Sequence, residues 1–109
     1  MSVWIGAKQI ANDAANAIRR AAPGMEVNQG EFIAPEPLEQ IVTTLIRCAN
    51  DFDDYPDCGE FAQQYREIAF RWQQKGRPKT QADYDADYRI VAEVETEMMS
   101  RMMKEHGRS

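Results

Sequence analysis

The chain has 109 residues, of which 43% are hydrophobic and 28% charged, and this balance excludes both two independent cores and an intrinsically disordered chain. Its formal charge of −5 argues against a nucleic-acid partner, because binding through phosphate neutralisation needs a concentrated basic face. We therefore expect one folded domain over 1–109 that does not bind nucleic acid.

The first predicted helix covers about 7–22. Its apolar residues recur at spacings of three and four, which places them on one helical face. Most of them are alanines, so a neighbouring helix can approach this face closely. A Pro-Gly pair ends the helix at 23–24, and we expect a loop over 25–34. The apolar face consists of Ile10, Ala14, Ala17, Ile18 and Ala21.

The second predicted helix covers about 37–52 and has the clearest apolar face in the chain. Pro35 and Pro37 suit its start, because the amide hydrogen that proline lacks would have no partner in the first turn. A turn around Tyr55 and Pro56 ends it. The apolar face consists of Leu38, Ile41, Val42, Leu45, Cys48, Ala49 and Phe52.

Two further helices are predicted over about 60–75 and 81–105. Gly76 ends the first of them, as a glycine just past a helix commonly does. Thr80 and Asp83 have the spacing of a capping box, which marks the start of the last helix. Four helices with short connections after the second and third predict an all-α, four-helix bundle-like single domain with a long C-terminal helix.

The cellular compartment follows from three absences in the sequence. No apolar run approaches the roughly 20 residues of a membrane-spanning helix, so no membrane partner is expected. The first residues lack the basic and long apolar regions of a signal peptide. Cys48 and Cys58 are too few for a disulfide framework. We therefore expect a cytoplasmic protein with reduced thiols.

Residues that could carry catalysis are scarce. The single histidine, His106, lies in a stretch where a helix would fray. Together with Cys48 and Cys58 it lacks the close ligand spacing of a zinc site, and we expect Cys48 to be a small buried hydrophobe. We predict no catalytic residue, no metal site and no cofactor, and we favour a protein that is not an enzyme.

Five acidic residues and no basic residue occur in the segment from Asn50 to Glu60, Glu60 included, which we call the acidic turn. A calcium loop starting at Asp51 would place Pro56 where an EF-hand needs glycine. A loose divalent-cation site stays open, but we favour a solvated turn whose charge attracts a basic partner surface. The candidate partner-binding residues of this turn are Asp51, Asp53, Asp54 and Asp57.

A basic cluster spans the connection between the third and fourth helices. It could bind phosphate together with the free amides of the following helix, and Tyr84, Tyr88 or Trp72 could stack on a nucleotide ring. We favour the alternative that these cations complement the dipole at the helix end and keep the turn soluble. The candidate phosphate-binding residues are Arg71, Lys75, Arg77 and Lys79.

Four methionines within six residues are the most informative feature of the sequence. At 1.5 Å per residue, the third helix is about 24 Å long and the fourth about 38 Å. A short connection makes them antiparallel neighbours, so we expect the third helix to cover the fourth only to about Thr96. The methionines beyond it either lie under the first helix or form an exposed apolar surface. They are Met98, Met99, Met102 and Met103.

The sequence thus predicts a non-enzymatic protein-binding module that acts through a helical surface and associates with itself. Small acidic helical proteins of this kind, including ones encoded by phages and other mobile elements, are often adaptors or inhibitors. The alternative hypothesis, from a different class, is a binder or small enzyme for a phosphorylated or nucleotide ligand.

Overall fold

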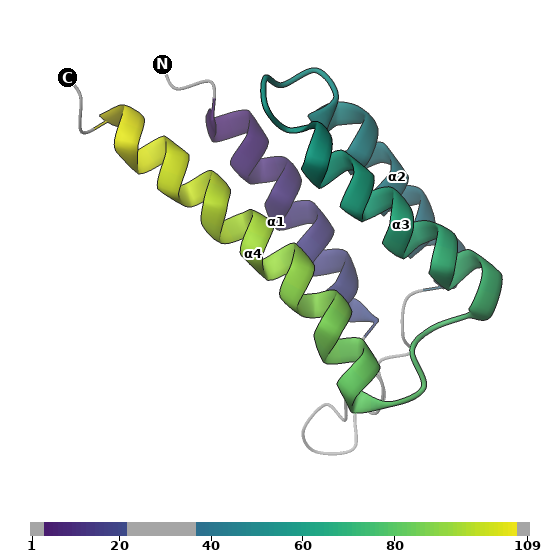
Figure 1. The fold of residues 1–109 in the computed structure, drawn as a ribbon. Coiled ribbons are helices and arrows are strands. Elements are labelled where there is room, and N and C mark those ends of the chain that lie inside the picture. The colour runs from purple at the N-terminus through teal and green to yellow at the C-terminus, as the bar shows by residue number, and fades with distance from the viewer. Residues whose placement is uncertain (1–3, 22–36, 107–109) are drawn as a thin grey trace.

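The computed structural model describes residues 4–21 and 37–106, and within these ranges it contains four α-helices and no strand (Figure 1). This confirms the predicted all-α class with a long C-terminal helix. The first helix lies earlier in the chain than expected, the other bounds agree within one residue, and the predicted loop over 25–34 lies outside the described residues. The helices are α1 (Trp4–Arg20), α2 (Leu38–Phe52), α3 (Gly59–Lys75) and α4 (Gln81–His106).

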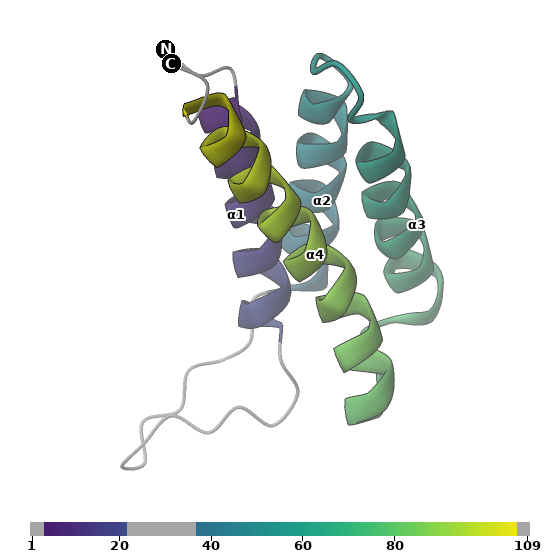
Figure 2. The same cartoon turned by 60° about the vertical axis from the view of Figure 1, so that its left-hand side comes forward.

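The four helices form two antiparallel pairs. α1 lies along α4, and α2 lies along α3, as Figures 1 and 2 both show. α1 also packs on α2, whereas α3 and α4 touch at few positions. The expectation that α3 covers the first part of α4 is therefore wrong. α1 packs along α4 instead. The buried face of α1 is mostly alanine, and such small side chains let a neighbouring helix approach closely.

Local signals in the sequence set the helix ends. Pro37 occupies the position before the first helical residue of α2, as expected for a proline at a helix start. Gly76 has a φ of +83°, and its amide donates a hydrogen bond of 2.8 Å to the carbonyl of Trp72. The Thr80 hydroxyl accepts a hydrogen bond of 3.1 Å from the Asp83 amide, which confirms the predicted cap of α4.

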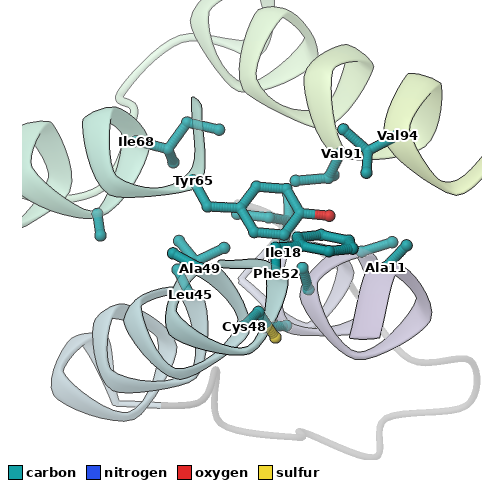
Figure 3. Close-up of a cluster of buried hydrophobic side chains, with 14 of the residues drawn as sticks. Ala11, Ile18, Leu45, Cys48, Ala49, Phe52, Tyr65, Ile68, Val91 and Val94 are labelled. Carbon is teal, nitrogen blue, oxygen red and sulfur yellow. The ribbon is translucent and has the colours of Figure 1, made fainter. Parts of the chain in front are cut away.

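The hydrophobic core lies where all four helices meet (Figure 3). Phe52 and Tyr65 pack with their ring centroids 5.4 Å apart. Cys48 is buried beside them, as expected, and its thiol donates a weak hydrogen bond to the Ile10 carbonyl. Burial raises the pKa of Cys48 to about 11. The largest fully buried side chains are Trp72, Tyr65, Phe52, Ile18, Ile41, Leu45, Ile68 and Met98.

The four helices also differ from membrane spans. None of them, within the part of the chain that the structure describes, combines the length and the apolar character that crossing a membrane requires.

Candidate interaction surface

The methionine end of α4 is divided between the core and the surface. Met98 is fully buried, so of the two predicted alternatives the exposed apolar surface is wrong for this residue. Met102 is half-buried. Met99 and Met103 are 38% and 64% exposed. Residues 98 and 102 thus turn toward the bundle, while 99 and 103, also one turn apart, face outward.

Arg101 explains why this end of α4 does not project freely. Its guanidinium carbon lies 4.9 Å from the ring centroid of Trp4 and 5.3 Å from that of Phe61, which are cation–π distances. Its Nε donates to Glu97 at 3.3 Å, and Nη1 donates to the Asp57 carbonyl at 3.5 Å. The end of α4 is therefore held against α1, α3 and the acidic turn.

The outward side of α4 carries an uncharged stripe three turns long. Its residues are spaced by four, three and four, and we call them the outer stripe. Over the same length Glu93, Glu97 and Arg101 occupy a different side of the helix. Glu95 flanks the stripe on the side of α1, where it pairs with Arg19. The outer stripe consists of Ala92, Thr96, Met99 and Met103.

One residue of α1 is an exposed hydrophobe at the same end of the molecule. Ile5 is 47% exposed at the start of α1. Figures 1 and 2 show that this end of α1 lies beside the end of α4, in agreement with the contact between Trp4 and Arg101. The two helices of one pair therefore contribute exposed apolar side chains to the same end of the molecule.

Arg19 fixes the other half of the α1–α4 contact. Its Nε donates to the Tyr88 hydroxyl at 3.1 Å, and Nη2 donates to Glu95 at 3.2 Å. The hydrogen bond that Arg19 donates to the Tyr88 hydroxyl is the main cause that raises the pKa of Arg19. Glu95, which interrupts the apolar pattern of α4 in the sequence, is thus matched by a cation from α1.

The acidic turn is partly neutralised by α3. Arg66 donates hydrogen bonds to the carboxylate of Asp53 and, at 2.9 Å, to the side chain of Asn50. Asp57 adopts a left-handed backbone conformation with a φ of +59°, a region that aspartate tolerates better than most residues. The acidic turn contains no basic residue of its own, but Arg66 of α3 partly neutralises it in the folded chain.

Asp51 and Asp54 occupy a different part of the turn. They line a shallow depression between α1 and α2, in which Asp13 of α1 forms an ion pair of 3.7 Å with Arg47. Among residues 4–21 and 37–106, no group of three or more His, Cys, Asp or Glu residues is arranged to hold a metal ion. The depression is lined by Gly6, Gln9, Ile10, Asp13, Asp51, Asp54 and Tyr55.

Arg71, the first candidate phosphate ligand, is engaged within the fold. Its Nη1 donates to both carboxylate oxygens of Asp87, at 2.7 and 2.8 Å. The indole Nε1 of Trp72 donates to the same carboxylate at 2.7 Å. Asp87 is almost fully buried, so this cluster satisfies a buried charge at the sparse contact between α3 and α4.

The aromatic candidates for nucleotide stacking are likewise used in packing. Tyr84 and Tyr88 stack on one another with their ring centroids 6.3 Å apart, and the buried Tyr84 hydroxyl donates to the Ile18 carbonyl. Trp72 is buried in the core. Of the remaining cations in the cluster, Lys75 and Lys79 are exposed and Arg77 is half-buried with an interaction of its own.

Sequence reasoning missed Ala92, Thr96 and Ile5 as parts of the candidate surface. The signal for the first two is present in the sequence as a second series of uncharged residues with helical spacing on α4. It is hard to recognise because alanine and threonine are not strongly apolar. Ile5 has no such signal, because its exposure depends on how α1 packs.

Comparisons with protein-family models, with curated proteins and with solved structures found no match for the chain. The function is therefore argued from the geometry of the described surface.

Proposed function

We propose that the chain is a non-enzymatic protein-binding module, an adaptor or inhibitor in the cytoplasm, that binds its partner through the outer stripe and Ile5. The exposure of Met99 and Met103 within an uncharged stripe three turns long supports this proposal. Contiguous exposed apolar side chains mark interaction sites in soluble proteins. Methionine side chains are flexible and polarizable, so they adapt to the shape of a partner.

The acidic turn gives this surface a charged neighbour. The contact from Arg101 to the Asp57 carbonyl places the turn next to the methionine end of α4. Acidic side chains near an apolar contact attract a partner with a basic rim and speed its association. We therefore propose that the acidic turn, with Asp57 at the contact to Arg101, attracts the partner to this end of the molecule, whereas Asp51 and Asp54 line the depression between α1 and α2 and lie apart from the outer stripe.

The proposal is tested by affinity capture with matched variants. The double variant Met99→Glu/Met103→Glu adds charge to the outer stripe, and Phe70→Glu adds charge to a residue of α3 that is 63% exposed. Two differently tagged copies are co-expressed, so that a second copy of the chain is detected as readily as another protein. Circular dichroism first establishes that both variants fold.

We expect the wild-type chain and Phe70→Glu to bind the same protein, and the outer-stripe variant to lose it. Calorimetry with that purified protein should then show at least tenfold weaker binding by the outer-stripe variant. Retention of the partner by the outer-stripe variant contradicts the proposal, as does a wild-type chain that captures no protein and stays monomeric at high concentration.

A further inference from the structure

We infer that the partner of the outer stripe is a second copy of the chain, bound with the two α4 helices antiparallel across a two-fold axis. This inference rests on the proposed function, because it uses the same surface. Spacings of four, three and four are those of a coiled-coil seam, in which two helices pack along one apolar stripe each. α4 thus has an inner seam for its own bundle and an outer seam for another helix.

The sizes of the four side chains select the antiparallel arrangement. A two-fold axis midway between Thr96 and Met99 places Ala92 opposite Met103 of the second copy. The same axis places Thr96 opposite Met99 of the second copy. Every long methionine then meets a smaller side chain, as interdigitated helix packing requires. A parallel pair would place Met103 against Met103 and Ala92 against Ala92, which overfills one layer and leaves a gap in another.

The charges beside the stripe are compatible with this arrangement. Glu93 faces Ser100 of the second copy, and Glu95 is already paired with Arg19 in its own chain. Arg101 is turned toward Trp4 and Phe61, away from the axis. No two like charges therefore meet along residues 92–103, so antiparallel packing brings no charge repulsion to the seam.

The length of the seam sets the expected strength of the dimer. Residues 92–103 span only about 17 Å of helix. An interface of this length buries less than the roughly 800 Å² per partner of a standard stable complex. We therefore expect a reversible dimer with a dissociation constant of about 1–100 µM, formed and lost within the range of laboratory concentrations.

Sedimentation equilibrium from about 1 to 500 µM tests whether the outer stripe forms the dimer. Thr96→Glu places a charge at the centre of the seam on a residue that is exposed in the single chain, so the fold is preserved. We expect this variant to weaken dimerisation at least tenfold, whereas Phe70→Glu on α3 should leave it unchanged. A dimer that Thr96→Glu does not weaken overturns the inference.

A second pair of variants tests the antiparallel register. Residues 92 and 103 lie about 17 Å apart on one helix, too far to pair within one chain, but they face each other across the proposed axis. Ala92→Lys/Met103→Glu should therefore dimerise at least tenfold more tightly than Ala92→Glu/Met103→Glu in low salt. Equal affinities, or a tighter dimer of the second variant, overturn the inference.

The outcomes for the partner and for the function are separable. A wild-type chain that stays monomeric at 500 µM overturns the second copy as partner. If the outer stripe nevertheless captures another protein, the proposed function stands. If the chain is monomeric and captures nothing, both proposals fail.

Discussion

The hydroxyl of Tyr65 tests whether an unpaired polar group in the core lowers the stability of the fold. Its oxygen is buried and has no hydrogen-bond partner among the described residues. Burial accordingly raises the pKa of Tyr65 above its ordinary value. Figure 3 shows the hydroxyl pointing away from α3 toward the part of the core that holds Val91 and Val94. A buried polar group without a partner costs about 1–3 kcal/mol of desolvation.

Tyr65→Phe removes this unpaired hydroxyl and keeps the ring, including its contact with Phe52 at 5.4 Å. A small gap remains where the oxygen was, and the lost packing offsets part of the gain. We therefore expect the free energy of unfolding to rise by about 1 kcal/mol. In a domain of this size such a change raises the melting temperature by about 4–8 °C, which thermal unfolding followed by circular dichroism measures readily.

Tyr84→Phe is the matched control, because removing the hydroxyl there should lower the free energy of unfolding instead of raising it. The Tyr84 hydroxyl donates a hydrogen bond of 2.8 Å to the Ile18 carbonyl and is buried. Its removal leaves that carbonyl without this donor and should lower the free energy of unfolding by about 1 kcal/mol. If both variants lose stability to the same extent, the Tyr65 hydroxyl has a partner, such as a buried water, and the reasoning is refuted.

Three further changes test other parts of the fold. Asp87→Asn removes the charge that binds Arg71 and should lower the free energy of unfolding by about 2 kcal/mol, measured by urea titration; an unchanged midpoint would show that the ion pair adds no stability. Burial raises the pKa of Cys48 from its ordinary 9.0 to about 11. Above pH 9 the Cys48 thiol therefore loses its proton in the unfolded chain but keeps it in the folded chain, and the free energy of unfolding falls by about 2–3 kcal/mol at pH 11. Urea titrations in reductant at pH 8.5 and 10.5 should show a smaller loss in Cys48→Ala than in the wild-type chain. Gly76→Ala meets no neighbouring atom within 4 Å, so its expected cost of about 2 kcal/mol in thermal unfolding comes from the φ of +83° and ψ of −176° alone.

Helix identity and helix ends are predictable here because they depend on local rules. The apolar spacing of Leu38 to Phe52 defines α2 without reference to any other element. Gly76 ends α3 because glycine adopts a positive φ without steric cost, and Thr80 caps α4 through its own hydroxyl. The all-α class follows once four such segments are recognised.

The pairing of the helices was not predictable in the same way. The short connection at 76–80 makes α3 and α4 neighbours in sequence, but it does not determine which surfaces fit. α4 packs along α1 because the alanines of α1 leave room for it, and because Arg19 matches Glu95 across that contact. Shape and charge at a tertiary contact depend on both helices at once, so inspection of either helix alone does not reveal them.

The sequence singled out the methionine segment but did not determine the environment of its single residues. It left open whether the four methionines lie under the first helix or form an exposed surface, and in the structure Met98 is buried whereas Met103 is 64% exposed. One residue along a helix changes direction by 100°, so consecutive methionines cannot share one environment. The acidic turn likewise gained a basic partner, Arg66, from a helix that follows it by several residues.

If the outer stripe binds as proposed, α4 separates folding from binding on two sides of one helix. Val91, Val94 and Met98 on its inner side are buried among the other helices and contribute to the stability of a single chain. Met99 and Met103 on its outer side are 38% and 64% exposed, so they add less to that stability than the buried side chains do. Exposed apolar side chains lower solubility unless another surface covers them. The proposed dimer would cover these two side chains, which the packing of a single chain leaves partly exposed.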